Sequence, residues 1–182
     1  MNDRNEDFDL VRKFLEGDES SFNRLVHKYQ QRIYWHARRM SGSHLDADEI
    51  VQVVLLVMYR KLKTFKFGAA LYTWIYRITS TRSLNFIKRK NLRSFFSIDD
   101  KEVQEIGSED IISDMEKKEK LEMISAYLQK LPPKQREVFI FRNYDDMPYE
   151  EIAKITGKSV GGLKANYFQA VKKMMELVNE KN

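Results

Sequence analysis

The sequence predicts an all-α protein with two small helical domains joined by an acidic linker. Apolar residues recur at spacings of three and four through most of the 182 residues, which is the period of an amphipathic helix. Only seven glycines and three prolines are present, too few for a turn-rich β fold. Charged residues make up 32% of the chain and aromatic residues 12%, which favours a folded protein over a disordered one.

Charge divides the chain into three segments. Residues 1–94 carry 18 basic and 10 acidic side chains, residues 95–118 carry 3 and 8, and residues 119–182 carry 11 and 9. Two positive segments separated by a negative one indicate two nucleic-acid-facing domains and a linker that DNA repels. We therefore place the domain boundaries at these charge changes.

The first segment predicts four helices, over residues 7–16, 21–40, 46–64 and 71–90. Gly17 breaks the pattern after the first helix, and Ser41-Gly42-Ser43 ends the second. Acidic residues in the first turn of the third helix suit the positive end of the helix dipole. The fourth helix divides into two sides. Its predicted core side holds Leu71, Ile75, Ile78 and Phe86, and its predicted solvent or ligand side holds Arg77, Thr81 and Lys88.

The third segment predicts a helix-turn-helix. A helical stripe from residue 119 stops at Pro132-Pro133, and two further helical patterns cover residues 134–143 and 149–156. Gly157-Lys158 then turns the chain, and Ser159 is a suitable N-cap for a last helix. A short helix, a glycine-containing turn and a second helix form the arrangement that many DNA-binding domains use.

A basic and aromatic stretch from Arg60 to Arg93 points to nucleic acid. It has ten Lys or Arg residues and no Asp or Glu, and aromatic residues lie among them. Cations contact phosphates whatever the base sequence, and aromatic faces stack on unpaired bases. A solvated basic helix over an ordinary aromatic core is the alternative interpretation of this stretch.

Several function classes have no support in the sequence. The chain has no cysteine, which excludes disulfides, thiolate zinc sites and cysteine nucleophiles. The three histidines are spaced eight and nine apart, and no phosphate loop or catalytic triad pattern is present, so we expect no enzyme, metal or cofactor. We interpret the carboxylates as helix caps and solvated charge. The polar N-terminus and the short apolar runs favour a cytoplasmic protein without membrane insertion.

Five short motifs resemble those of bacterial extracytoplasmic-function (ECF) sigma factors, in the same order along the chain. They are Asp46–Gln52 (DADEIVQ), Tyr72–Ile78 (YTWIYRI), Leu131–Phe139 (LPPKQREVF), Tyr149–Ala153 (YEEIA) and Ser159–Lys164 (SVGGLK). Each motif is modest alone, and their order makes the resemblance specific. The resemblance implies a DNA-binding subunit of bacterial RNA polymerase holoenzyme that directs transcription initiation.

The resemblance assigns a role to each domain. Residues 1–94 are expected to bind the clamp of the largest core polymerase subunit and to melt the minus-ten promoter element. Residues 119–182 are expected to read the minus-thirty-five element as double-stranded DNA. The acidic linker, residues 95–118, is expected to thread toward the RNA exit path. An anti-sigma factor is a further expected partner.

The resemblance also implies three sets of site residues. The minus-ten set, for phosphates and unstacked bases, is Phe67, Gly68, Tyr72, Arg77, Thr81, Asn85, Lys88, Arg89 and Lys90. The minus-thirty-five set is Ser159, Gly162, Lys164, Ala165, Phe168, Gln169, Lys172 and Lys173. The core-polymerase set is Asp46, Asp48, Glu49, Gln52, Val53 and Leu56. Trp74 is expected to pack in the core, while Tyr72 and Tyr76 suit either core packing or base stacking.

The chain departs from the family pattern at several of these positions. The family commonly has Thr, Ser and Arg where Gly162, Ala165 and Gln169 stand, so few long donors face the minus-thirty-five element. We therefore expect this element to be read largely by phosphate contact and DNA shape. The family often has Asn at the position of Thr81 and a carboxylate at that of Val53. The apolar third helix predicts either an apolar contact with a partner or deeper burial than usual.

Two alternatives remain beside the sigma factor. One is a helix-turn-helix regulator that binds DNA without core polymerase. The other is a sigma-like decoy that occupies an anti-sigma factor and supports no transcription. Binding to core polymerase separates the first alternative from a sigma factor, and transcription separates the second.

Overall fold

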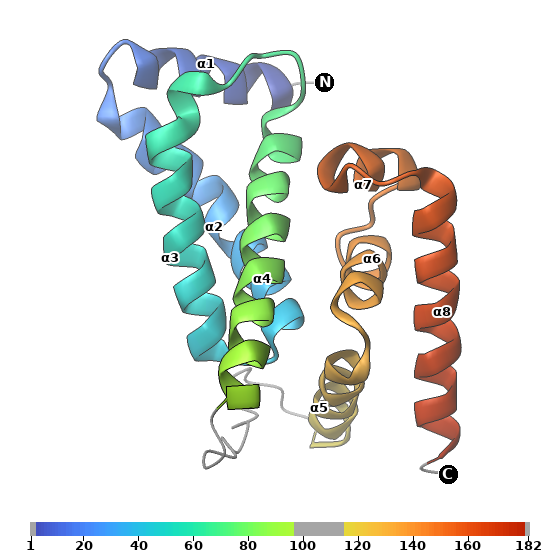
Figure 1. Ribbon diagram of the computed structural model, residues 1–182. Helices are drawn as coiled ribbons and strands as arrows, with labels where there is room; N and C mark the ends of the chain where they lie inside the picture. The colour runs from blue at the N-terminus through green and yellow to red at the C-terminus, as the bar shows by residue number, and fades with distance from the viewer. Residues whose placement is uncertain (1–2, 97–114, 181–182) are drawn as a thin grey trace.

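The computed structural model describes residues 3–96 and 115–180, and every regular element in these ranges is helical. The elements are α1 (Asp3–Leu15), α2 (Glu19–Ser41), α3 (His44–Lys61), the short 3-10 helix η1 (Leu62–Thr64), α4 (Leu71–Phe96), α5 (Met115–Lys130), α6 (Pro133–Asn143), α7 (Tyr149–Thr156) and α8 (Val160–Asn179) (Figure 1). The all-α prediction is confirmed. Within the predicted linker, α4 continues to Phe96, α5 begins at Met115, and residues 97–114 lie outside the described residues.

The first domain, α1 to α4, encloses one apolar core. α2, α3 and α4 pack against one another, and α1 lies across one end of them (Figure 1). Leu25, Val54, Leu71 and Ile75 are completely buried in this core. The helix ends follow local chemistry, because the Asp18 carboxylate accepts the backbone N–H of Ser20 at 3.0 Å and caps α2.

The second domain, α5 to α8, contains the predicted helix-turn-helix. α7 ends at Gly157, which has a φ of 70° and closes the helix in the left-handed conformation. The Ser159 hydroxyl then accepts the backbone N–H of Gly162 at 3.2 Å and caps α8. Ile152 and Leu163 are buried between the two helices, which fixes their crossing.

The two domains pack directly against each other. α4 contacts α6 and α7, and α2 contacts α5 and α6. Tyr76 of α4 is buried in the same cluster as Val138 and Phe141 of α6. Met40 of α2 and Ile87 of α4 share a second cluster with α6. Part of the apolar core is therefore made jointly by both domains.

Two carboxylates contradict the expectation that acidic residues cap helices or lie in solvent. Glu137 is completely buried and contacts Ser80 and Lys158. Asp7 is 3% exposed and accepts the Tyr29 hydroxyl at 2.6 Å. Each buried carboxylate has a donor from a distant part of the sequence, and hydrophobic periodicity does not reveal such partners.

Candidate nucleic-acid and polymerase interfaces

α4 carries a row of polar side chains that faces away from both domain cores. The exposed members of the predicted minus-ten set on this helix are Arg77, Thr81, Asn85, Lys88 and Arg89. Their spacing of three or four residues places them on one side of the helix. The predicted core side is confirmed, because Leu71, Ile75 and Phe86 are buried and Ile78 packs against their cluster.

Two cations of the predicted minus-ten set have polar protein partners in this structure. The Lys90 ammonium lies 3.0 Å from the Asp46 carboxylate, which belongs to the predicted core-polymerase set. The Arg77 guanidinium donates to the backbone carbonyl of Lys154 in α7. The two predicted surfaces therefore meet at Asp46 and Lys90, and the second domain contacts one end of the polar row at Arg77, which stays exposed.

The predicted base-capturing loop, Phe67 to Tyr72, is anchored to α1. Phe67 has a φ of 49°, in the left-handed region that a bulky residue rarely adopts. Its ring packs edge-on against Phe8 at a centroid separation of 5.2 Å, and the Arg12 guanidinium lies 5.5 Å from the ring centroid. Gly68 and the residue after it are exposed. The loop therefore presents backbone and small side chains. Its two aromatic residues, Phe67 and Tyr72, are half-buried, and Leu71 and Tyr72 already belong to α4.

The aromatic residues of α4 serve mainly as packing groups. Trp74 packs against the first-domain core and lies 5.8 Å from Phe65 between ring centroids, as expected. Tyr76 is 6% exposed, and burial together with the Asp145 charge raises the pKa of its hydroxyl. Tyr72 is half-buried between the two domains. Tyr76 is therefore unavailable for base stacking in this arrangement.

The predicted core-polymerase set forms the outer face of α3. Four of its members are exposed: Asp48, Glu49, Gln52 and Leu56. Val53 is half-buried and lines a groove of about 460 Å³ between α3 and α4. Asn85, Lys88 and Arg89 line the same groove from the α4 side. The predicted polymerase and minus-ten residues are therefore neighbours, with an apolar floor formed partly by Ile50 and Phe86.

α8 exposes nearly all of the predicted minus-thirty-five set. The exposed members are Ser159, Gly162, Lys164, Ala165, Phe168, Gln169 and Lys172. Phe168 is 66% exposed, a large apolar side chain in contact with water. Lys173 is half-buried and lies 3.5 Å from the Glu176 carboxylate. The opposite side of α8 buries Leu163 and Ala170, so the helix is held by one face and presents the other.

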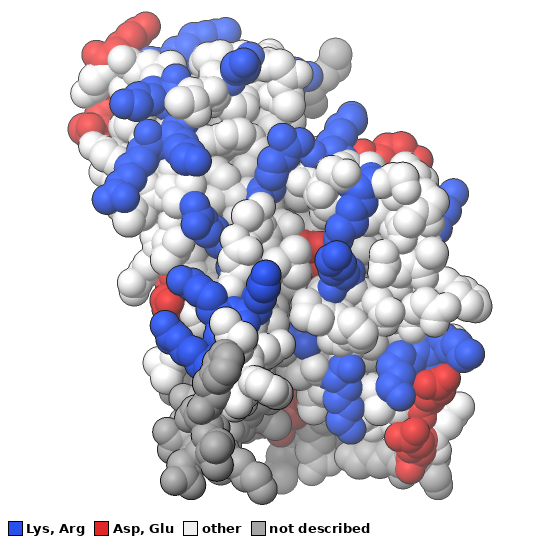
Figure 2. All heavy atoms as spheres, in the orientation of Figure 1, with Lys and Arg blue, Asp and Glu red and all other residues white. Residues whose placement is uncertain are grey.

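Lys and Arg side chains predominate on the face of the molecule that carries α3, α4 and α7, as Figure 2 shows. Few Asp or Glu side chains interrupt this face. Such a surface attracts a polyanion. In the described part of the chain, no group of three or more His, Asp or Glu side chains is suited to hold a metal ion. The described helices also include none that is both long and apolar enough to cross a bilayer.

Sequence reasoning missed the polar residues that join the two domains. They are His36, Ser80, Gln129, Arg136, Glu137 and Asp145. One signal was available: Glu137 lies three and four residues before the buried Ile140 and Phe141, so the helical period places it on the core side of α6. Nothing in the sequence indicated its partner Ser80.

Two family models match the chain, one in each domain. The model for Sigma-70 region 2 matches residues 25–93, and the model for Sigma-70, region 4 matches residues 121–174. Among curated proteins, the ECF RNA polymerase sigma-E factor of Escherichia coli (strain K12) is 29% identical over 169 residues, which is 88% of each chain. The sigma-E factor of Haemophilus influenzae is 28% identical over 172 residues, covering 88% of this chain and 89% of that protein.

Solved structures share this fold. CnrH, in complex with the cytosolic domain of CnrY, superposes with a TM-score of 0.71 at 19% identity and covers 99% of both chains. The sigma factor RpoE of Bartonella quintana, in complex with the anti-sigma factor NepR, gives a TM-score of 0.67 at 22% identity, covering 87% of this chain and 96% of that one. With both sigma-70 regions present in order and sigma-E relatives matching along most of its length, the chain belongs to the sigma-70 family, in its extracytoplasmic-function group.

Proposed function

We propose that this chain binds core RNA polymerase, recognises and melts promoter DNA, and directs transcription initiation. The observation that carries the proposal is the presence of two exposed, differently built surfaces in the order of the sigma-70 regions: the polar row of α4 and the outer face of α8. A protein that opens a promoter needs a surface for the separated strands and another for the duplex upstream. Enzyme chemistry forms no part of this proposal.

Each domain takes one part of this function. Residues 1–94 bind the polymerase clamp through the outer face of α3 and hold the minus-ten strand along α4. The exposed Lys88 and Arg89 contact phosphates, and the loop after Phe67 receives an unstacked base. Residues 119–182 place α8 in the major groove of the minus-thirty-five element. Residues 95–118 connect the two domains.

An anti-sigma factor is a further proposed partner. Support comes from a sigma factor of similar structure, RpoE of Bartonella quintana, which was solved with the anti-sigma factor NepR bound. Exposed apolar side chains, including Leu56 on α3 and Phe168 on α8, suit contacts with a protein partner.

Run-off transcription with purified core polymerase and a genomic fragment library tests the function. Promoter-specific transcripts that require both the chain and core polymerase are the expected result. Specific DNA binding without core polymerase would instead identify a helix-turn-helix regulator. Binding to an anti-sigma factor with no transcription would identify a decoy.

A matched pair of double variants tests the role of α4. Lys88→Ala with Arg89→Ala should weaken promoter opening, and the salt dependence of binding to a forked promoter should fall by about one unit of slope per lost phosphate contact. Lys13→Ala with Arg24→Ala removes the same net charge from exposed positions on α1 and α2. Equal effects of the two double variants would contradict the proposal that α4 holds the minus-ten strand.

The outer face of α8 predicts how the upstream element is recognised. Gly162 and Ala165 offer no hydrogen-bonding side chain, and Gln169 is the one exposed amide among the predicted residues. We expect a base-by-base promoter scan to give small penalties at most upstream positions and a broad dependence on DNA shape. Sharp penalties at every upstream position would rule this out.

A further inference from the structure

We propose that the free chain is held closed by a polar latch between its two domains, and that closing withholds the Arg77 end of the α4 row from nucleic acid. The latch consists of His36, Ser80, Gln129, Arg136, Glu137 and Asp145. The closed state is independent of the proposed function, and its consequence for DNA rests on that function.

The first contact of the latch joins α2 to the loop before α7. His36 is completely buried, and its Nδ1 lies 2.8 Å from the Asp145 carboxylate, which is itself 8% exposed. The Nε2 atom of His36 is buried and has no partner among the described residues. The Asp145 contact is therefore the hydrogen bond that compensates the burial of this imidazole.

The second contact joins α4 to α6. The Ser80 hydroxyl donates to the completely buried Glu137 carboxylate, whose other oxygen lies 3.2 Å from the Lys158 ammonium. Lys158 belongs to the same domain as Glu137, whereas Ser80 comes from the other domain. Separation of the domains thus removes one partner from a buried charge and opens it to water.

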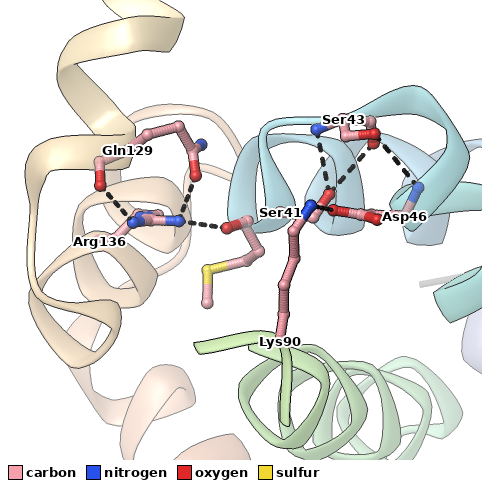
Figure 3. A network of polar contacts seen from close by, with 7 residues as sticks. Ser41, Ser43, Asp46, Lys90, Gln129 and Arg136 are labelled. Carbon is pink, nitrogen blue, oxygen red and sulfur yellow. Dashed lines mark hydrogen bonds and ion pairs between the residues drawn. The ribbon is translucent and has the colours of Figure 1, made fainter. Parts of the chain in front are cut away.

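The third contact joins α5 and α6 to the end of α2. The Arg136 guanidinium donates to the backbone carbonyl of Met40, and Gln129 donates to that of Arg39 at 3.0 Å. Figure 3 shows Gln129 and Arg136 pointing toward this end of α2. Burial lowers the pKa of the Arg136 guanidinium to about 10, so it remains charged at neutral pH. This buried cation is held across the interface by the Met40 carbonyl, and within its own domain by Gln129 and the Leu131 carbonyl.

The interface combines two shared apolar clusters, around Tyr76 and around Met40, with a set of buried polar groups, and these polar groups favour a reversible contact. Its hydrogen-bonding groups include a carboxylate, a guanidinium and an imidazole, all of which water solvates well when the domains separate. Interfaces between domains of this polar kind resemble those of transient complexes, and relative domain motion is their ordinary behaviour.

Closing occupies part of the predicted minus-ten surface: Tyr72 is half-buried between the domains, and Arg77, although exposed, is bonded to α7. The Arg77 guanidinium is engaged by the Lys154 carbonyl, and Tyr76 beside it is buried against α6. Lys154 lies in α7, the first helix of the helix-turn-helix. Thr81 and the residues after it in the α4 row remain exposed. The closed chain therefore offers an incomplete surface for a single strand.

Fluorescence transfer between the domains tests the closed state directly. The chain has no native cysteine, so dyes can be attached through Lys66→Cys and Glu150→Cys, two exposed positions outside the predicted sites. The variant Asp145→Asn removes the carboxylate that faces His36. Asp146→Asn removes an exposed carboxylate one residue later, where asparagine tolerates the φ of 49°.

We expect one high-transfer population in the parent chain and in Asp146→Asn. In Asp145→Asn the ratio of closed to open molecules should fall at least about tenfold, because a buried imidazole loses its charged partner. Identical transfer distributions in the two variants would overturn the latch. Ser80→Ala should open the chain as well, whereas Ser83→Ala should not, since the buried Ser83 hydroxyl has no described partner.

A second measurement tests the consequence for nucleic acid. The probe is a labelled single-stranded oligonucleotide of mixed sequence, followed by anisotropy. Asp145→Asn should bind it at least about threefold more tightly than Asp146→Asn, since more molecules are open while the net charge is equal. Equal affinities would contradict the proposal that closing withholds part of the α4 row from nucleic acid. If run-off transcription fails but fluorescence transfer still differs between Asp145→Asn and Asp146→Asn, the proposed function is rejected and the latch is retained.

Discussion

At the scale of single residues, Gly42 has two roles: it ends α2, and it lies against Gln129 of the other domain. It ends α2 with a φ of 82°, a conformation that glycine adopts without strain. A Cβ atom at this position would lie 2.6 Å from the Gln129 side chain. Because Gln129 bonds both Arg39 and Arg136, it has little freedom to move away.

Gly42→Ala is therefore predicted to lower stability more than backbone strain alone would. Gly17→Ala is the matched control, since Gly17 has a φ of 102° and nothing within 4 Å of the added Cβ. Strain should cost each variant about 1–2 kcal/mol, and Gly42→Ala should lose about 1 kcal/mol more through Gln129. Urea unfolding measures both, and equal losses would show that Gln129 yields freely.

Because the Tyr76 hydroxyl is buried, we expect the free energy of unfolding to depend on pH in the alkaline range. Its pKa is raised in the folded chain by burial first and by Asp145 second, from an ordinary value of 10.0. Above pH 10 the unfolded state therefore loses this proton while the folded state keeps it. The free energy of unfolding falls as pH rises, by up to about 1.4 kcal/mol per pH unit from this residue.

Tyr76→Phe should remove that contribution. The difference in unfolding free energy between parent and variant is expected to stay constant from pH 7 to about pH 9 and to shift in favour of the variant above about pH 10. Chemical unfolding at each pH measures it. Parallel profiles up to about pH 11 would mean that Tyr76 reaches solvent in solution.

Local chemistry explains which residues were predictable. Ser159 as a cap and Gly157 as a turn follow from rules that involve neighbours in the sequence. The role of Arg136 and Glu137 depends on groups 96 and 57 residues away. A charged side chain in a helical pattern is ordinarily solvated, so sequence alone predicts the wrong environment when distant partners bury it.

At the scale of elements, α4 has two buried sides, whereas the sequence predicted only one. Its hydrophobic pattern predicted one core side and one solvent or ligand side. In the structure it packs on two domains: Leu71 and Ile75 face the first core, while Tyr76 and Ser80 face α6 and its neighbours. The polar row from Thr81 onward was predictable because it belongs to neither contact. The second buried side was not, because it becomes buried only when the domains meet.

The outer face of α3 is predicted to bind core polymerase partly through an apolar contact. Leu56 is 47% exposed and lies beside the half-buried Val53 in the predicted polymerase surface. Leu56→Asp should leave the fold intact and weaken binding to core polymerase by about tenfold or more, since a charge would replace an apolar contact at the interface.

Leu45→Asp is the matched control for this face. Leu45 is 80% exposed at the start of α3, outside the predicted surface. The same substitution there should leave polymerase binding nearly unchanged. Affinities measured by fluorescence titration decide the matter, and circular dichroism confirms that both variants are folded. Equal loss in the two variants would mean that a general apolar or charge effect, and not this surface, governs binding.

At the scale of the whole molecule, the shared core predicts how the chain unfolds. Tyr76, Phe141 and Val138 form one buried cluster from two domains, and the latch adds buried polar groups whose partners lie across the interface. Unfolding either domain would expose apolar surface and unpaired groups on the other. The parent chain should therefore lose both domains in one cooperative transition.

The positions of tryptophan make this cooperativity measurable. Both tryptophans, Trp35 and Trp74, lie in the first domain, so tryptophan fluorescence follows that domain, whereas far-ultraviolet circular dichroism follows all helices. The two thermal midpoints should coincide in the parent and in Asp146→Asn, and should separate in Asp145→Asn because the weakened interface no longer couples the domains. Separate midpoints in the parent would show that each domain is stable without the other. Coincident midpoints in Asp145→Asn would mean that the apolar cluster around Tyr76 is enough to couple them.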